Sequence, residues 1–435
     1  MMKSLYKKKQ TKSLMTLIIC FVVITCTFTV LTLLYGLIPS NLTEKNMLRS
    51  LDILDNEGNN VQFKDITGMD ISFAGDGNKV DNFTNMWMIQ SVDSEHFFDG
   101  NQFRKGKPYN PDNREYIEGN FAVKVFSSSW ENGNYWSGYR LFFKPLMIFF
   151  DVWGLRIIQI SLIIIALIWT FIKIRQEIGL IEAVLLIIAV LAVNPLNILF
   201  GFDQGPDLIQ ALFSIVTVLW MLRKKVEYKW VLSYFLFIGM FEIFINCLIM
   251  PLVTLGLPLI TYLLYEHKKG TELKIQFKNT ITFSFVWGVG YVGTFISSWI
   301  ISALFKHISP IESVKRGIGA FVYRCGGNDD SIIKNISDSV HSNINHNVPF
   351  IWLIIIFLVF IFLISWMNHK TRKYLFRLLP LVFVSLYPFI WIILLNNHSL
   401  IHAWMVHDIF IVSIWGFLLN IYYLMNNDDI RLTLN

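Results

Sequence analysis

Long apolar runs, separated by short polar stretches, make up most of this sequence. A helix of about 20 apolar residues crosses a bilayer, and runs of about that length recur along the chain. The pattern therefore predicts an all-α polytopic membrane protein. The expected transmembrane helices, about ten in all, are residues 14–38, 155–172, 178–200, 208–222, 230–248, 252–265, 281–305, 349–367, 378–395 and 409–425.

Two of these spans, 208–222 and 252–265, are short for a hydrocarbon core of roughly 30 Å. Pro251, Gly256 and Pro258 fall at the start of the second one or inside it. Proline removes a backbone donor and disfavours a helix interior. We therefore expect a broken or re-entrant element in this part of the chain.

The first long polar stretch, residues 39–140, follows the first apolar run directly. It is rich in Asp, Asn, Gly and aromatic residues, and its acids outnumber its bases. Alternating stretches at 61–63 and 121–126 predict short strands, and Asn-Gly pairs indicate turns. We expect a mixed α/β extracytoplasmic module here. A second outer loop, 306–348, is expected to turn at its glycines, which are Gly317, Gly319, Gly326 and Gly327.

The stretch Tyr139–Trp153 is aromatic but too interrupted to span a membrane. Lys144, Pro145 and Asp151 punctuate it. A short helix with an apolar face and charged interruptions is typical of the membrane interface. We expect an amphipathic helix that lies on the outer surface of the bilayer.

These features divide the chain into five parts. They are residues 1–38, a cytoplasmic N-terminus with the first transmembrane helix; 39–140, the extracytoplasmic loop module; 141–305, the interface helix and transmembrane bundle; 306–348, the second extracytoplasmic loop; and 349–435, the C-terminal helices with an outer histidine-rich loop at 396–408.

Charge refines this picture in two ways. The chain is 54% hydrophobic and 16% charged, and its net charge of +6 is modest for a nucleic-acid-binding protein. Lys and Arg fall in alternate short loops, whereas 201–207 and 396–408 contain neither. The positive-inside rule then places both termini in the cytoplasm.

The four cysteines do not form a disulfide framework.

The polar stretch 396–408, between two apolar runs, is the main candidate for chemistry. His398 and His402 are four residues apart and share one face if this stretch is helical. His407 and Asp408 follow at the start of the next run. Three readings stay open: a re-entrant loop whose polar groups satisfy the backbone, a substrate-binding or catalytic rim, and a metal site. The histidine spacing matches no tight metal signature, so no metal ligand is assigned and no cofactor is predicted, although a divalent metal stays open.

Polar residues inside the apolar runs are a second signal. Glu182, Glu242 and Asn246 stand out. A carboxylate in mid-membrane costs roughly 2.5–3.5 kcal/mol on insertion scales, so it normally faces a partner or a cavity. Glu242 and Asn246 share a helix face. Either they make interhelical contacts or they line an outward-facing cavity.

Four segments of the chain form a further pattern: residues 81–88, 135–146, 239–258 and 397–402. Together they resemble bacterial multi-pass membrane proteins of the GT-C class of glycosyltransferases. The first is Asp81-Asn-Phe-Thr-Asn-Met-Trp-Met. The second is Tyr135-Trp-Ser-Gly-Tyr-Arg with Lys144-Pro-Leu after it, and the third runs from Gly239-Met to Pro251-Leu-Val-Thr-Leu-Gly-Leu-Pro. The fourth is Asn397-His-Ser-Leu-Ile-His. The resemblance covers most of the chain, and the last two segments are its most specific part.

The resemblance implies transfer of a sugar from a polyprenyl-phosphate carrier to an envelope glycan or glycolipid, on the outer face of a bacterial plasma membrane. Such a reaction needs a base for the acceptor hydroxyl and cations or dipoles for the departing phosphate. The candidate catalytic residues are Asp81, Asp93, Glu95, His398 and His402. The candidate substrate-binding residues are Asn85, Tyr135, Trp136, Tyr139, Arg140, Lys144, Asn246, Asn397, Ser399, His407 and Asp408. We expect the first loop and the histidines to surround one site.

Three departures from the family pattern keep other functions open. Asn85 and Asn246 stand where carboxylates are expected, and His407-Asp408 stands near an expected aromatic-Arg pair. An amide cannot act as a general base. The alternatives are a transporter or flippase of lipid-linked saccharides and a non-catalytic membrane protein of envelope assembly.

Overall fold

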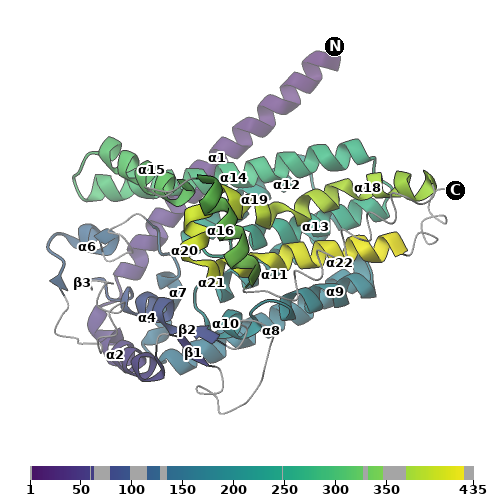
Figure 1. Cartoon of the computed structure of the whole chain (residues 1–435). Helices are drawn as coiled ribbons and strands as arrows, with labels where there is room; N and C mark the ends of the chain where they lie inside the picture. Colours follow the sequence, from purple (N-terminus) through teal and green to yellow (C-terminus); the bar gives the residue numbers. More distant parts are fainter. Residues whose placement is uncertain are drawn as a thin grey trace.

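The structure is a computed structural model of the chain (Figure 1). It describes residues 2–58, 60–62, 79–97, 115–127, 135–246, 248–326, 332–345 and 369–425. The predicted span at 349–367 lies outside the described residues.

Six helical segments of the described chain are long and apolar enough to cross a membrane. They are the Ser13–Gly36 part of α1 (Met2–Gly36), α8 (Val152–Glu177), α11 (Gly205–Arg223), α12 (Tyr228–Ile245), α14 (Leu273–Phe305), and His407–Met425, which joins η3 (His407–Phe410) to α22 (Ile411–Met425). A seventh is formed by α18 (His369–Ser385) and α19 (Tyr387–Leu394) if their pair, bent by 41°, is one span. The chain is therefore an all-α polytopic membrane protein; the count of ten spans stays a prediction.

The predicted span 178–200 is divided into two helices. α9 (Leu180–Leu191) has 12 residues, and α10 (Pro195–Phe200) begins a separate turn. Pro195 occupies the first turn of α10, where its missing N–H costs nothing, and Asn194 caps that helix by accepting from Asn197 N at 3.2 Å. Asn-Pro thus starts a new helix instead of continuing the old one.

The centre of the bundle is α13 (Pro251–Lys268), which packs against α11, α12, α14, α18 and α22. Every residue from 251 to 265 is buried. The expected break lies before Pro251, because α12 ends at Ile245 and α13 begins at Pro251; the helix continues through Gly256 and Pro258. A Cβ at Gly256 would lie 2.5 Å from Val412 Cγ1, so this glycine allows α22 to approach.

The described part of the first loop is mostly helical. It contains α2 (Ser40–Glu57), α4 (Asn82–Gln90) and α6 (Phe121–Ser127), with two short antiparallel pairs. β1 (Asn60–Gln62) pairs with β2 (Lys79–Asp81), and β3 (His96–Phe97) pairs with β4 (Glu115–Tyr116). The strand predicted at 121–126 is wrong, because this stretch is α6. The mixed α/β character of the whole loop stays a prediction.

Helix α6 forms because its apolar residues find partners on two spans. Phe126 stacks on Phe305 of α14 with ring centroids 4.9 Å apart. Val125 packs so close to Gly36 of α1 that a Cβ there would lie 2.3 Å from its Cγ2 atom. Tertiary packing here outweighs the alternation that favoured a strand.

The segment predicted as an interface helix gives α7 (Arg140–Met147) and then the start of α8. Asp151 caps α8 by accepting from Trp153 N at 3.1 Å and Gly154 N at 3.3 Å. Arg140 and Lys144 are fully buried. The charged residues of α7 therefore face protein, and its placement on a bilayer surface stays a prediction.

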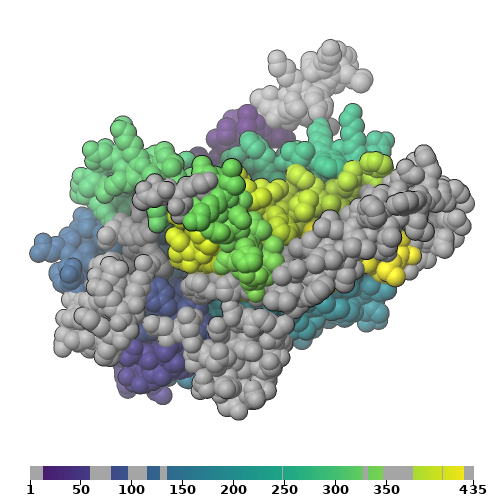
Figure 2. Space-filling view, in the orientation of Figure 1, coloured from purple at the N-terminus to yellow at the C-terminus, as the bar shows by residue number. Residues whose placement is uncertain are grey.

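The second outer loop also folds as helices, α15 (Pro310–Gly326) and α16 (Ile332–Asn345). Turns at Gly317 and Gly319 are therefore a wrong prediction. Gly317 is a packing residue, since a Cβ there would meet the Trp299 indole at 2.4 Å. Figure 2 shows α15 and α16 in green on the face where yellow elements of the C-terminal part emerge, and α16 packs on α19, α20 (Asn396–Ile401) and α21 (Ala403–Val406).

The bundle has two chemically different ends. At one end, Arg223 pairs with Glu177 at 3.0 Å and Lys268 Nζ donates to Ile178 O at 2.8 Å. We call this the basic end. The opposite end, at the left of Figure 1, carries the first-loop elements, α10 and α21. We call it the cluster end, for the residues described next.

Candidate functional site

Five buried carboxylates gather at the cluster end, and we call them the acidic cluster. They are Asp81, Asp203, Asp207, Glu242 and Asp408, each at most 3% exposed. Asp203 interacts electrostatically with Asp81, Asp207 and Asp408, and Asp207 with Glu242. Four separate parts of the chain therefore supply one site: the first loop, the turn before α11 with the first turn of α11, the end of α12 and η3.

A chain of hydrogen bonds from backbone N–H groups to side-chain oxygens joins the first loop to the histidine-rich stretch. Asp81 N donates to Asn197 Oδ1 at 2.9 Å, and Asn197 N donates to Asn194 Oδ1 at 3.2 Å. Asn194 N in turn donates to Asp408 Oδ1 at 3.2 Å. α10 lies beside β2 in Figure 1, as these contacts require. Asp81 and Asp408 are thus held near each other although they are remote in sequence.

The turn that carries Asp203 is held in place by Gln159 of α8. Gln159 Nε2 donates to Gly201 O at 2.8 Å and to Leu199 O at 3.1 Å. A Cβ at Gly205 would overlap the Gln159 amide at 2.3 Å, so this position must stay small. Gln159 therefore fixes the position of the turn at the N-terminal end of α11.

Two asparagines hold the same turn, and both use donors that a carboxylate lacks. Asn85 accepts from Phe202 N at 2.8 Å and donates to Phe200 O at 3.2 Å. Asn246 Nδ2 donates to Asp203 O. Aspartate at either position would place a further charge in the cluster and lose these donors. Local geometry therefore explains why amides replace the expected carboxylates.

The carboxylates of the cluster are poorly compensated. Both oxygens of Asp203 and both of Glu242 are buried, with no hydrogen-bond partner at normal distance in the described chain. Asp207 and Thr254 are polar neighbours of Glu242. Among the described residues, no Lys or Arg forms an ion pair with any of the five acids. Buried carboxylates without a cation hold protons or await a polar ligand.

The two loop carboxylates of the cluster titrate near neutral pH. Burial raises the pKa of Asp203 to about 7. Burial, and then the nearby Asp203 carboxylate, raise the pKa of Asp81 to about 8. Asp81 also caps α4, accepting from Phe83 N at 3.0 Å and Thr84 N at 3.3 Å. Asp81 is therefore fixed in place, whereas neither carboxylate oxygen of Asp203 has a hydrogen-bond partner among the residues that the structure describes.

His407 and Asp408 are in direct contact. His407 Nδ1 lies 3.0 Å from Ala403 O, and since a carbonyl only accepts, Nδ1 carries a hydrogen. Nε2 lies 3.3 Å from Asp408 Oδ1. That contact is favourable only if one proton sits between the two atoms, on the imidazole or on the carboxyl. Both side chains are buried.

The other two histidines lie beside a strained turn. His398 Nε2 faces Leu248 O at 3.4 Å, and the rings of His398 and His402 are 4.8 Å apart. Leu248 has a φ of 72°, which is rare outside glycine. Burial first, and then His402 and Arg324, lower the pKa of His398 to about 3, so this ring is neutral. Its Nδ1 atom then carries a lone pair.

Arg324, in the last turn of α15, links this histidine pair to the aromatic segment. Its Nη2 donates to Tyr135 Oη at 2.7 Å. Tyr291 of α14 lies between the two halves of the site, since it interacts with Glu242 and Asp207 as well as with Tyr135 and Arg324. The Tyr291 hydroxyl is buried and has no hydrogen-bond partner among the described residues. The acidic cluster and the histidines therefore border one polar region.

A second polar group surrounds Lys144 and is separate from the cluster. Lys144 Nζ donates to Ser94 Oγ at 2.8 Å, and both Lys144 and Arg140 lie over the Tyr35 ring. Burial, and then Arg140, lower the pKa of Lys144 to about 8. The rings of Phe143 and Phe202, 5.0 Å apart, stand between this group and the Asp203 turn.

The predicted residues near Lys144 mostly serve the fold. Arg140 donates to the carbonyls of Ser137, Val125 and Trp136. Asp93 accepts from Glu95 N at 2.8 Å and from the His96 ring at 2.9 Å, while Glu95 itself is exposed. Tyr139 Oη lies 2.6 Å from Ser91 Oγ. These contacts therefore stabilise the protein next to the acidic cluster, and the residues that make them do not line it.

The remaining predicted residues flank the histidine pair or the bundle. Trp136 Nε1 donates to Thr294 O at 2.9 Å. Asn397 Nδ2 donates to Tyr323 O at 2.9 Å. Ser399 lies inside α20. Its hydroxyl is buried with no hydrogen-bond partner among the described residues, and its carbonyl accepts from Asn343 Nδ2 at 2.7 Å. Across the described ranges, no three His, Cys, Asp or Glu side chains are arranged to hold a metal ion.

Sequence reasoning missed the central residues of this site. Asp203, Gln204 and Asp207 lie in the 201–207 loop, which the sequence places among the polar outer loops but to which it assigns no functional residue. Arg324 lies in the 306–348 loop, where turns are expected. The available signal was a pair of carboxylates at a helix start in a loop without Lys or Arg. Gln204 strengthens it, because both atoms of its buried amide lack a partner in the described chain.

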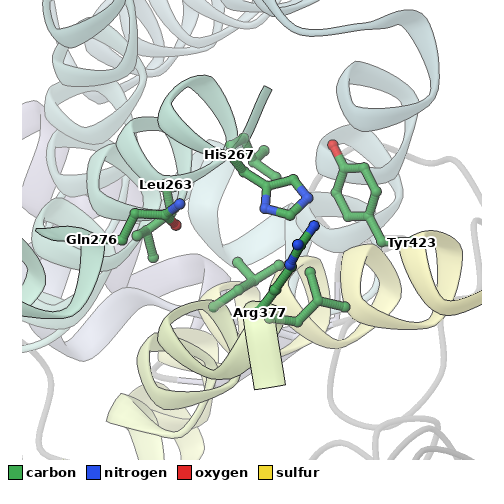
Figure 3. A pocket seen from close by; sticks show the side chains of 8 residues that line it. Leu263, His267, Gln276, Arg377 and Tyr423 are labelled. Carbon is green, nitrogen blue, oxygen red and sulfur yellow. The ribbon is translucent and has the colours of Figure 1, made fainter. Parts of the chain in front are cut away.

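A small cavity at the basic end is a weaker candidate. Figure 3 shows the side chains of His267, Arg377 and Tyr423 turned toward one another. Its volume is about 10 Å³, enough for about one water molecule. Tyr423 Oη donates to Glu182 Oε1 at 2.7 Å. These contacts join α22 to α9 and α13, and they account for Glu182 as a structural residue.

Comparison with models of known protein families, with curated proteins and with solved structures finds no match for this chain. The function is therefore argued from the residues of the acidic cluster and from their neighbours at the same end of the bundle.

Proposed function

We propose that this chain is a GT-C-type membrane glycosyltransferase. It moves a sugar from a polyprenyl-phosphate carrier to an envelope glycan or glycolipid at the outer face of a bacterial plasma membrane. In this proposal the cluster end is the outer end, and both termini are cytoplasmic. The alternation of basic loops supports that orientation, because Lys and Arg favour the cytoplasmic side.

The observation that carries the proposal is the position of Asp203 beside Asp81. The two carboxylates come from different loops, both are buried, and Asp203 keeps both oxygens without a partner in the described chain. A general base works best when its pKa lies near the working pH. Burial brings the pKa of Asp203 into that range. We therefore assign Asp203 as the base, whose pKa is raised by burial, and Asp81 as its buried acidic neighbour.

The proposed reaction is a single displacement at C1 of the donor sugar. Asp203 accepts the proton of the acceptor hydroxyl as that oxygen forms a bond to C1 of the donor sugar. The bond from C1 to the carrier phosphate breaks, and the phosphate leaves with the electron pair. Arg324 is the cation placed to neutralise that charge, and the neutral His398 ring beside it can accept a hydrogen bond from a sugar hydroxyl through Nδ1.

Aromatic and hydroxyl groups suit the sugar itself. Tyr135 and Tyr291 lie between Arg324 and the carboxylates, and both are buried. Aromatic faces pack against the apolar faces of a sugar ring, while a tyrosine hydroxyl both donates and accepts. Asn85 and Asn246 act by positioning the Asp203 turn. The non-catalytic alternative therefore loses its main support, the two missing carboxylates.

One observation favours a transporter as the second candidate. Asp207 and Glu242 lie on two membrane-spanning helices and interact with each other without a cation partner in the described residues. Helix α12 also ends beside them at Ile245, and the next helix begins at Pro251. Buried acids next to a broken helix are typical of proton- or cation-coupled transport.

Reconstituted vesicles separate these functions. Purified protein in vesicles is supplied with polyprenyl-phosphate sugars and a lipid or glycan acceptor, and products are followed by mass spectrometry. Transfer by the wild type that disappears in Asp203→Asn supports the transferase. Movement of the lipid-linked sugar across the bilayer without a new glycosidic bond selects the transporter and refutes the proposal.

A further inference from the structure

An open groove runs between α8 and α11 at the basic end, far from the acidic cluster. Its volume is about 500 Å³, within the usual range of about 300–1,000 Å³ for small-molecule sites. Trp169, Lys173 and Glu177 of α8 form one wall. Thr217 and Trp220 lie on the α11 side, which also contributes Arg223. One face of the groove is apolar and its mouth is charged.

The mouth has more positive than negative charge. Arg223 Nη1 contacts Glu177 Oε1 at 3.0 Å, and the Arg223 side chain is 63% exposed. Lys173 Nζ contacts Gln176 Oε1 at 3.3 Å. A guanidinium has five N–H donors and an ammonium has three, so both groups keep donors for a further acceptor. Two cations against one carboxylate favour an anion at this mouth.

The apolar face continues the groove along the helices. Trp169 is 42% exposed and Trp220 is 55% exposed, although both are large and apolar. Trp169 packs edge-on against Phe213, with ring centroids 5.7 Å apart. Exposed Ile165 and Ile168 extend this surface along α8 toward mid-membrane. Tryptophan and basic residues are typical of the membrane interface, and aliphatic residues are typical of the hydrocarbon core. The order of residues along the groove therefore follows the layers of one membrane leaflet.

We propose that this groove binds one anionic glycerophospholipid. The phosphate lies between Lys173 and Arg223, which donate charge-assisted hydrogen bonds to its oxygens. The glycerol region lies near Thr217, and the acyl chains cover Trp169, Trp220 and the isoleucines of α8. Basic pockets between spanning helices bind anionic headgroups by this chemistry. The inference is independent of the reaction at the acidic cluster.

The test measures lipid binding to the full-length protein in detergent by native mass spectrometry. Phosphatidylglycerol and phosphatidylcholine are titrated separately. We expect the first phosphatidylglycerol to bind the wild type more tightly than phosphatidylcholine does. A basic residue near a membrane surface strengthens anionic binding about fivefold, so the Lys173→Gln/Arg223→Gln variant should weaken phosphatidylglycerol binding by roughly tenfold or more. Phosphatidylcholine binding should change little.

A matched control removes the same charge beside the groove. Lys224→Gln/Lys225→Gln lies at the same end but outside the lining, and it should bind phosphatidylglycerol almost as the wild type does. A third variant, Thr217→Phe, fills the groove without altering charge and should weaken both lipids. Equal losses in the control and the Lys173/Arg223 variant would mean diffuse surface attraction and would overturn the proposal. The proposal would also be overturned if the wild-type protein buries this groove against a second copy of the chain.

Discussion

Asn85 Oδ1 accepts a hydrogen bond from Phe202 N at 2.8 Å, which ties the first loop to the turn that carries Asp203. The same side chain donates to Phe200 O at 3.2 Å. An amide can serve a donor and an acceptor at once, and a carboxylate cannot. The geometry of the acidic cluster thus depends on a residue that has no acid–base chemistry of its own.

We therefore expect Asn85→Asp to destabilise the protein. The aspartate loses the bond to Phe200 O and adds a buried charge beside Asp81 and Asp203. Leaving one buried acceptor unsatisfied costs about 1–3 kcal/mol. Thermal unfolding in detergent at pH 7 should show a lower Tm, whereas Asn41→Asp, on an exposed position of α2, should not. An Asn85→Asp protein that is fully stable and more active would instead make position 85 a catalytic carboxylate site.

Asp203→Asn should abolish sugar transfer without unfolding the protein. Loss of a positioned general base lowers a rate by roughly 10²–10⁴-fold. The amide has nearly the same shape and removes a buried carboxylate, so stability at pH 8 should be equal or higher. Glu118→Gln, an exposed acid in the first loop, is the matched control and should transfer normally. Wild-type rates in Asp203→Asn would remove Asp203 from the mechanism.

The raised pKa values predict a distinctive pH dependence of stability. Asp203 and Asp81 have folded pKa values of about 7 and about 8, both above the ordinary value of 3.8. Between about pH 4 and pH 8 the folded state keeps protons that the unfolded state loses. Stability therefore falls as the pH rises through this window. The Tm of the wild type should drop between pH 5 and pH 8 relative to that of Asp203→Asn; a constant difference between the two would contradict the raised pKa.

Much of the fold could be predicted from hydropathy. Runs such as 155–172 and 281–305 coincide with α8 and α14, because a helix in lipid needs little beyond continuous apolar residues. Local errors arose where tertiary packing decides. Phe121–Phe126 alternates like a strand but folds as α6 against two spans, and Gly317 fits under Trp299 instead of making a turn.

The site was predictable only in part. The sequence predicted that the first loop approaches His398 and His402 around one cavity, and this stays a prediction. The structure joins Asp81 to Asp408, at the end of the same stretch, through Asn197 and Asn194. It could not show that Asp203 lies between them, because that depends on where the turn before α11 is held. Nor could it show that Arg140 donates its hydrogen bonds to backbone carbonyls, while Arg324 donates to the Tyr135 hydroxyl.

The orientation is tested by cysteine labelling in intact cells. In a background without the four native cysteines, Glu118→Cys reports on the first loop and Glu272→Cys on a loop at the basic end. A membrane-impermeant maleimide added outside should modify position 118 and spare position 272 until the cells are opened. Modification of position 272 in intact cells would invert the topology and place the acidic cluster in the cytoplasm.

Arg324 should control binding of the donor phosphate more than the proton transfer. Its guanidinium is held by Tyr135 and lies near the histidine pair, so it offers a planar set of donors to a phosphate. Removing a charge-assisted hydrogen bond costs about 1.5–3 kcal/mol, or roughly 10- to 150-fold. Arg324→Gln should therefore raise KM for the lipid-linked sugar by about that factor and leave the pH profile of transfer unchanged, since the base is elsewhere. Arg324→Lys keeps the charge but not the planar fork, and it should recover only part of the loss. Lys315→Gln, which removes an exposed charge from the same helix, is the control and should have wild-type kinetics. If Arg324→Gln leaves KM unchanged and shifts the pH profile instead, Arg324 acts on the carboxylates and the phosphate lies elsewhere.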